Sequence, residues 1–122
     1  MDEGKYYIKI KLMGLPSGGN SRQHWRDKYT EVSKWKSAIL KAVGDNKPPS
    51  PLQKVKLRYT RSSSNTMDWD NVAISFKAVQ DGLTEAGVIA DDKIKNIPEM
   101  PIYDQVAGKR GKGYITIEVW EI

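Results

Sequence analysis

Cysteine is absent from the 122-residue chain, and histidine occurs once, at His24. A chain without cysteine cannot form disulfides, cysteine-containing zinc sites or a thiol nucleophile. A single histidine disfavours both a metal site with several imidazole ligands and a Ser–His–Asp triad, although one histidine could still serve as a base. These absences exclude disulfide scaffolds and cysteine-ligated zinc proteins.

Long apolar segments are also missing. The apolar stretches span only a few residues, whereas a helix needs roughly 20 to cross a bilayer. The opening sequence, Met1-Asp2-Glu3-Gly4, is acidic and lacks the apolar core of a secretory signal. We therefore expect a soluble, cytoplasmic protein with no membrane association.

The composition is that of a globular chain, with 39% hydrophobic and 29% charged residues. Its length predicts a single domain over residues 1–122, because domains most often run to roughly 100–150 residues. The 20 Lys and Arg residues exceed the 15 Asp and Glu residues by 5, which gives a net charge of +5. This balance favours an anionic partner such as nucleic acid, and an ordinary basic surface is the alternative.

Hydrophobic periodicity predicts an α+β domain. Apolar residues at steps of three and four indicate two helices, over residues 22–43 and 70–86, which end at Gly44 and Gly87. Alternation of apolar and polar residues indicates strands. The expected strands span residues 6–12, 52–60, 93–100 (an irregular piece) and 114–120, with a polar loop at 61–66 and a basic turn at 109–113. The order β-α-β-α-β-β predicts two helices covering a small mixed sheet.

Four of the acids form two tight groups, Asp68-Trp69-Asp70-Asn71 and Asp91-Asp92. One aspartate of the first group could cap the second helix, but capping explains neither its neighbour nor the later doublet. Clustered carboxylates repel one another unless a cation neutralises them, and oxygen ligands suit Mg²⁺ or Mn²⁺. An EF-hand loop from Asp68 fails, because Ala73 and Val79 stand where Gly and Glu are required. A glycosyltransferase D-x-D site needs a much larger nucleotide-binding domain.

The polar face of the second predicted helix carries a lysine near the first acidic group. Asp70, Ile74, Lys77 and Asp81 follow one line along this face. Lys77 and Asp81 could form an ordinary surface ion pair. Alternatively, Lys77 could stand beside a metal site and contact a phosphate.

The run Asp68-Trp-Asp-Asn71, the segment Lys77-Ala-Val-Gln-Asp-Gly-Leu83 and the segment Gly87-Val-Ile-Ala-Asp-Asp92 resemble the RusA family of Holliday-junction resolvases. The opening strand and the loop Leu15-Pro-Ser-Gly-Gly-Asn-Ser21 are also similar to the family's beginning. The resemblance implies a small dimeric endodeoxyribonuclease that uses Mg²⁺, for which Mn²⁺ can substitute. It further implies a bacterial or phage-encoded protein of the host cytoplasm, which acts in DNA recombination and repair.

Carried over by position, the family's catalytic, metal-binding aspartates fall on Asp68, Asp70 and Asp92, and Asp91 matches their less critical neighbour. The family's lysine matches Lys77 only if three residues are inserted before it, because Ile74 occupies the usual place. The basic residues that often precede the D-x-D are replaced by residues 65–67.

The mechanism implied is metal-assisted hydrolysis of a phosphodiester in branched DNA. Lys77 would stabilise developing negative charge, and other basic residues would bind flanking phosphates. These expected DNA-binding residues are Lys54, Lys56, Arg58, Arg61, Lys109, Arg110 and Lys112. For the first three, the plain solvated face of an edge strand is an equal explanation, because lysines on such edges also block aggregation.

A helix over residues 70–86 would be roughly 25 Å long, and six extended residues return at most about 20 Å. Asp92 would then barely approach Asp70, so a site shared between two chains of a dimer stays open. Two other functions also remain: a non-catalytic DNA-binding recombination protein, and a nuclease for flaps or forks. Trp25 and Trp35 are expected in the core, His24 on a helix surface, and Trp69 is ambiguous.

Overall fold

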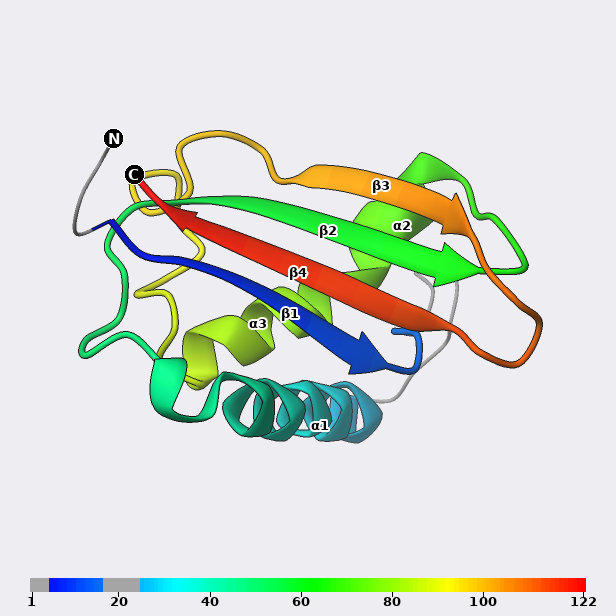
Figure 1. The fold of residues 1–122 in the computed structure, drawn as a ribbon, viewed down its shortest axis with the longest axis horizontal. Coiled ribbons are helices and arrows are strands. Elements are labelled where there is room, and N and C mark those ends of the chain that lie inside the picture. The colour runs from blue at the N-terminus through cyan, green and yellow to red at the C-terminus, as the bar shows by residue number, and fades with distance from the viewer. Residues whose placement is uncertain (1–4, 17–24) are drawn as a thin grey trace.

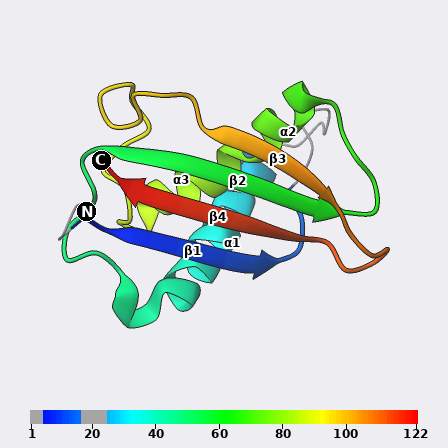
Figure 2. The same ribbon diagram turned by 45° about the horizontal axis from the view of Figure 1, so that its top comes forward.

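A mixed four-stranded sheet forms one layer of the protein, and the helices form a second layer against one of its faces (Figures 1 and 2). The computed structural model describes residues 5–16 and 25–122, with side chains in the first helix from residue 30 onward. The elements are β1 (Tyr7–Met13), α1 (Trp25–Val43), η1 (Gly44–Asn46), β2 (Val55–Ser63), α2 (Trp69–Ser75), α3 (Lys77–Glu85), β3 (Ile102–Ala107) and β4 (Tyr114–Glu121).

The strands lie in the order β1-β4-β2-β3. Strand β4 is antiparallel to both of its neighbours, and β3 is parallel to β2. Parallel neighbours need a crossover connection, which α2 and α3 supply here. The chain then passes the end of β2 and inserts β4 between β2 and β1 (Figure 1). The α+β class, the mixed sheet and the predicted order of elements are confirmed.

Alternate side chains of the sheet point toward the helices and build the core, as the period of two predicts. Ile10, Ile117 and Tyr59 lie side by side in register on this inner face and are buried. Trp35 of α1 and Leu83 of α3 are buried against the same cluster. The prediction that Trp35 belongs to the core is confirmed.

Helix α1 agrees with its prediction over the described residues. It ends at Val43, and Gly44 follows with a φ of +47°, a conformation that favours glycine. His24 and the side chain of Trp25 lie outside the described part. No helix within the described ranges is long and apolar enough to cross a membrane.

The second predicted helix is wrong as a single element, because it divides at Phe76 into α2 and α3. The Ser75 hydroxyl donates a 2.7 Å hydrogen bond to the Val72 carbonyl, which also accepts a 3.2 Å bond from the Phe76 N–H. Such side-chain bonding to the previous turn bends helices. The Phe76 ring stacks on Tyr59 with centroids 4.9 Å apart and lies 6.2 Å from Tyr103, so tertiary packing holds the bend.

The predicted strand at 52–60 is displaced, since β2 runs from Val55 to Ser63. The loop predicted at 61–66 is therefore wrong for its first three residues, which are buried. Strands β4 and β3 flank β2 as far as Ser62 and Ser63 respectively, so the backbone there pairs on both sides despite its polar sequence.

The strand-like piece predicted at 93–100 is also wrong. Its backbone turns, because the Lys93 carbonyl accepts hydrogen bonds from the N–H groups of Asn96 and Ile97. The Asn96 side chain donates a 2.7 Å bond to the Gln53 carbonyl and anchors this turn beside β2. The third strand is instead Ile102–Ala107.

Candidate functional site

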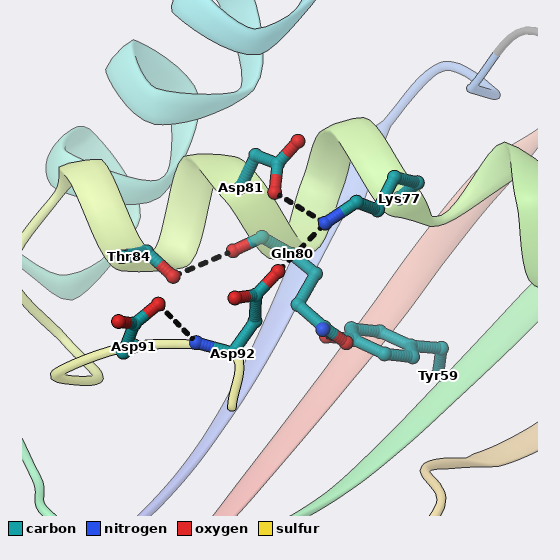
Figure 3. Close-up of polar contacts among 7 residues, drawn as sticks. All are labelled: Tyr59, Lys77, Gln80, Asp81, Thr84, Asp91 and Asp92. Atoms are coloured by element: carbon teal, nitrogen blue, oxygen red, sulfur yellow. Dashed lines mark hydrogen bonds and ion pairs between the residues drawn. The ribbon is translucent and has the colours of Figure 1, made fainter. Parts of the chain in front are cut away.

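Lys77 joins two carboxylates that are distant in sequence (Figure 3). Its Nζ lies 3.0 Å from Oδ1 of Asp81, one turn later on α3, and 2.7 Å from Oδ2 of Asp92. The surface ion pair between Lys77 and Asp81, one of the two alternatives for this lysine, is present. The contact with Asp92 places the later acidic doublet beside the start of α3.

A tight helix end brings Asp92 to this position. After α3, the Gly87 N–H bonds to the Thr84 carbonyl and the Val88 N–H bonds to the Leu83 carbonyl, a Schellman motif. Gly87 has a φ of +79°, which a residue with a side chain rarely adopts. The reversed chain pairs with Leu52 and then passes alongside α3.

The contact between Lys77 and Asp92 favours the charged form of both groups. Partial burial acts to lower the pKa of Lys77, but hydrogen bonds to Asp92 and Asp81 outweigh it and leave that pKa raised. The hydrogen bond from Lys77 lowers the pKa of Asp92. Both groups are therefore charged at neutral pH. Because the Lys77 side chain is 58% exposed, solvent weakens the interaction.

Asp91 supports this arrangement from the preceding position. Its Oδ1 accepts a 2.8 Å hydrogen bond from the Asp92 N–H, and its Oδ2 lies 3.7 Å from Lys93. A pocket of about 260 Å³ adjoins these residues. Its lining comprises Val32, Asp81, Thr84, Glu85, Asp91 and Asp92. Sequence reasoning did not include Thr84 and Glu85; the i, i+4 spacing of Glu85 from Asp81 is the signal that could have found it.

Asp68 and Asp70 lie at the start of α2. Asp68 occupies the N-cap position with extended backbone, φ −61° and ψ 147°, yet its side chain makes no capping hydrogen bond. Both residues are exposed. Within the described chain, neither carboxylate has a hydrogen bond or an ion pair, so the prediction that one of them caps the helix is wrong. Their charges suit the positive end of the helix dipole and remain available for another cation.

The segment before Asp68 is fastened to the sheet by side chains. The Met67 N–H donates to Oε1 of Gln105 at 2.9 Å, and Nε2 of Gln105 donates to the Met67 carbonyl at 2.8 Å. Nη1 of Arg61 donates a 2.6 Å bond to the Asn65 carbonyl. Arg61, expected to bind DNA, is only 8% exposed and instead braces this segment. Its Nε has no hydrogen-bond partner, and burial lowers its pKa.

The expected metal ligands are thus divided in space. Lys77 and Asp92 meet, whereas no group of three His, Cys, Asp or Glu side chains among the described residues is close enough to hold a metal ion. Asp68, Asp70 and Asp92 therefore do not converge within the described part of one chain. Two free carboxylates at the start of α2 still offer the oxygen ligands that Mg²⁺ prefers.

The expected DNA-binding residues fall on different parts of the molecule. Lys56 and Arg58 alternate with the buried core residues of β2, so they project from the sheet face opposite the helices. Strand β3 pairs with β2 only from Arg58 onward, so the edge-strand explanation is wrong for Arg58, whereas Lys56 precedes the paired segment and has β4 alone beside it. Arg58 is engaged by acids, with its Nε 2.7 Å from Oδ2 of Asp104 and 4.0 Å from Oε1 of Glu118.

The basic turn between β3 and β4 lies elsewhere. Lys109, Arg110 and Lys112 are exposed, at the end of the sheet from which β2 leads to α2 (Figure 1). They are the expected phosphate-binding residues at the same end of the sheet as Asp68. In comparisons with known proteins, no protein-family model and no curated protein sequence matches the chain.

Proposed function

We propose that the protein is a Mg²⁺-dependent, structure-selective endodeoxyribonuclease of the RusA type, which resolves four-way DNA junctions in the bacterial cytoplasm. One observation carries the proposal: the carboxylates of Asp68 and Asp70 stand exposed at a helix start, without a capping role or a partner in the described chain. A stable arrangement of two such charges is favoured by a bound cation.

Each residue of the site has a distinct part in this proposal. Asp68 and Asp70 would hold the ion together with Asp92 and its neighbour Asp91. When bound, Mg²⁺ supplies an activated water and neutralises charge on the scissile phosphate. Lys77, kept protonated by its carboxylate partners, directs positive charge at the phosphate oxygens.

The division of the acids favours a homodimer with a shared site. Asp92 is held by Lys77 in its own chain, whereas Asp68 and Asp70 have no partner there. A second copy could complete the ligand set by bringing its own Asp92 to this Asp68–Asp70 pair. Mixing an Asp68→Asn/Asp70→Asn chain with an Asp92→Asn chain tests this, because only a shared site restores cleavage in the mixed dimer.

The direct test is a cleavage assay on a synthetic four-way junction with Mg²⁺, with duplex, flap and fork substrates of matched sequence. We expect the junction to be cut preferentially and Asp70→Asn to abolish cleavage while junction binding is retained. Asp45→Asn is the matched control, because Asp45 is an exposed aspartate in η1, at the other end of the sheet (Figure 1). The proposal is contradicted if the wild-type protein fails to cleave the junction with either Mg²⁺ or Mn²⁺ at every pH tested.

A non-catalytic DNA-binding recombination protein is the second candidate. The observation that favours it is the exposed, lysine-bearing face of the sheet, which lies away from the helices that carry the acids. If the protein only binds DNA, the Asp70→Asn variant should retain full biological activity. If the protein is a nuclease, the variant should lose that activity.

A further inference from the structure

The sheet face opposite the helices is uncovered in the described structure (Figure 2). Its central strands, β4 and β2, lie between the edge strands β1 and β3. In a two-layer α+β domain such a face is open to solvent, and every second residue of each strand points outward from it. Four rows of side chains cross this face in register.

Aromatic and basic side chains lie near one another on three neighbouring strands of this face, β1, β4 and β2. Tyr7 and Trp120 are direct neighbours across β1 and β4, with ring centroids 5.4 Å apart and planes tilted by 39°. Lys56 follows Trp120 in the same row. Farther along, the Lys11 ammonium lies 4.2 Å from the centroid of the Tyr114 ring. Strand rise places Trp120 and Tyr114 about 20 Å apart, which is a track long enough for several nucleotides.

The charges of this face are not balanced. Its two acids in the described chain, Asp104 and Glu118, both contact Arg58, and Glu118 also accepts a 2.9 Å hydrogen bond from the Tyr7 hydroxyl. The lysines of the face are exposed and form no ion pair in the described chain, and Lys9 stands opposite Glu118 in the register. They are Lys9, Lys11 and Lys56. Packing a second copy against this face would bring the same lysines together, so self-association is disfavoured and an anionic partner is favoured.

We propose that the open face of the sheet binds single-stranded DNA, with bases stacking on Tyr7 and Trp120 and phosphates contacting Lys9, Lys11 and Lys56. Aromatic rings on an open sheet stack on the faces of unpaired bases, and these faces are covered in a duplex. Tyr7 is suited to this contact because 49% of its surface is exposed. The surface lies on the opposite side of the sheet from Asp68 and Asp70, and its binding does not depend on cleavage.

The test measures the fluorescence anisotropy of a labelled thymidine oligomer of about 15 nucleotides, titrated with full-length protein in EDTA. Tyr7→Ser should weaken binding about tenfold, because one base–aromatic stack is lost. Tyr7→Phe keeps the ring and should bind like the wild type. Lys9→Gln/Lys56→Gln should make the slope of log affinity against log salt shallower by about 1.4.

The matched control for charge is Lys41→Gln/Lys95→Gln, which removes two exposed lysines from α1 and from the turn before β3. It should leave both the affinity and the salt slope unchanged. Thermal unfolding of each variant shows whether it is folded. The proposal is overturned if the oligomer does not bind, if a duplex binds as tightly, or if Tyr7→Ser binds like Tyr7→Phe. The binding assay involves neither a metal ion nor cleavage, so this proposal can hold even if the nuclease assay fails.

Discussion

Replacing Gln105 by leucine should destabilise the protein by about 2 kcal/mol. The side-chain amide makes two hydrogen bonds to the backbone of Met67, at 2.9 and 2.8 Å, both partly buried. Each such bond contributes a net 0.5–1.5 kcal/mol, roughly, and leucine leaves both Met67 backbone groups without that partner. For a domain of this size, about 2 kcal/mol corresponds to a fall in Tm of about 8 °C.

Urea unfolding at pH 7 measures the effect, and amide hydrogen exchange locates it. The Met67 N–H should exchange faster in Gln105→Leu, because its acceptor is lost. Gln105→Glu should also be destabilised, since a carboxylate oxygen would replace the donor that faces the Met67 carbonyl. Val106→Thr is the control: it alters an exposed neighbour on the opposite face of β3 and should cost less than about 0.5 kcal/mol. A Gln105→Leu variant as stable as this control would refute the reasoning.

Three further substitutions test other contacts. Lys77→Gln, compared with the wild type in EDTA, should cost less than about 1 kcal/mol at pH 7, because the ion pairs are exposed. The pKa of Asp92 is lowered, so the stability that the Lys77–Asp92 pair contributes should be lost as pH falls through the folded pKa of Asp92, below its ordinary 3.8. The pKa of Lys77 is raised, so the same contribution should also be lost as pH rises through the folded pKa of Lys77, above its ordinary 10.5. Urea unfolding across that range checks it, and a pH-independent difference would contradict it. Gly82→Ala should destabilise by about 2 kcal/mol, since the added Cβ would lie 3.0 Å from the Lys36 backbone nitrogen and force α1 away from α3; an unchanged Tm contradicts this close approach. Gly87→Ala should cost about 1 kcal/mol or more in urea unfolding because of the φ of +79°, and an equally stable variant would show that this turn tolerates a side chain.

Strands with an apolar inner face could be predicted from the sequence, and β3 could not. In β1 and β4 the apolar residues alternate toward the helices, so pattern and burial coincide. In β3 the apolar Ile102 and Val106 are exposed on the open face, whereas Gln105 points inward to Met67. Apolar and polar residues do alternate along β3, but here the apolar ones face solvent. Only the pairing of β3 with β2 shows which face of the strand the helices cover.

The division of the second helix was equally hidden, because Val72, Phe76, Val79 and Leu83 keep the same spacing through a bent helix as through a straight one. The bend arises from the Ser75 hydroxyl and from the stacking of Phe76 on Tyr59, which is a contact distant in sequence.

Within the candidate site, spacing along one helix was informative and spacing between elements was not. The pair of Lys77 with Asp81 follows from a separation of four residues on α3. The pair of Lys77 with Asp92 depends on the path of the chain after the helix end at Gly87. The bridge between Ile89 and Leu52, a contact distant in sequence, directs that path. The sequence carries no signal for the hydrogen bonds between Met67 and Gln105, because they join a loop residue to a strand residue distant in sequence through one side-chain amide.

The arrangement of charge gives the sheet two chemically different sides. On the helical side, the carboxylates of Asp68 and Asp70 lack a partner in the described chain, and Asp92 is neutralised by Lys77. On the open side, Lys9 and Lys56 flank the Tyr7 and Trp120 rings. A net charge of +5 averages these opposed surfaces and describes neither of them. Under the two proposals, the carboxylates at one end of the molecule would act on one strand of a branched DNA, and the open face would bind another. For that reason the Asp70→Asn and Tyr7→Ser variants should fail in different assays: the first in cleavage of a bound junction, the second in binding of an unpaired strand.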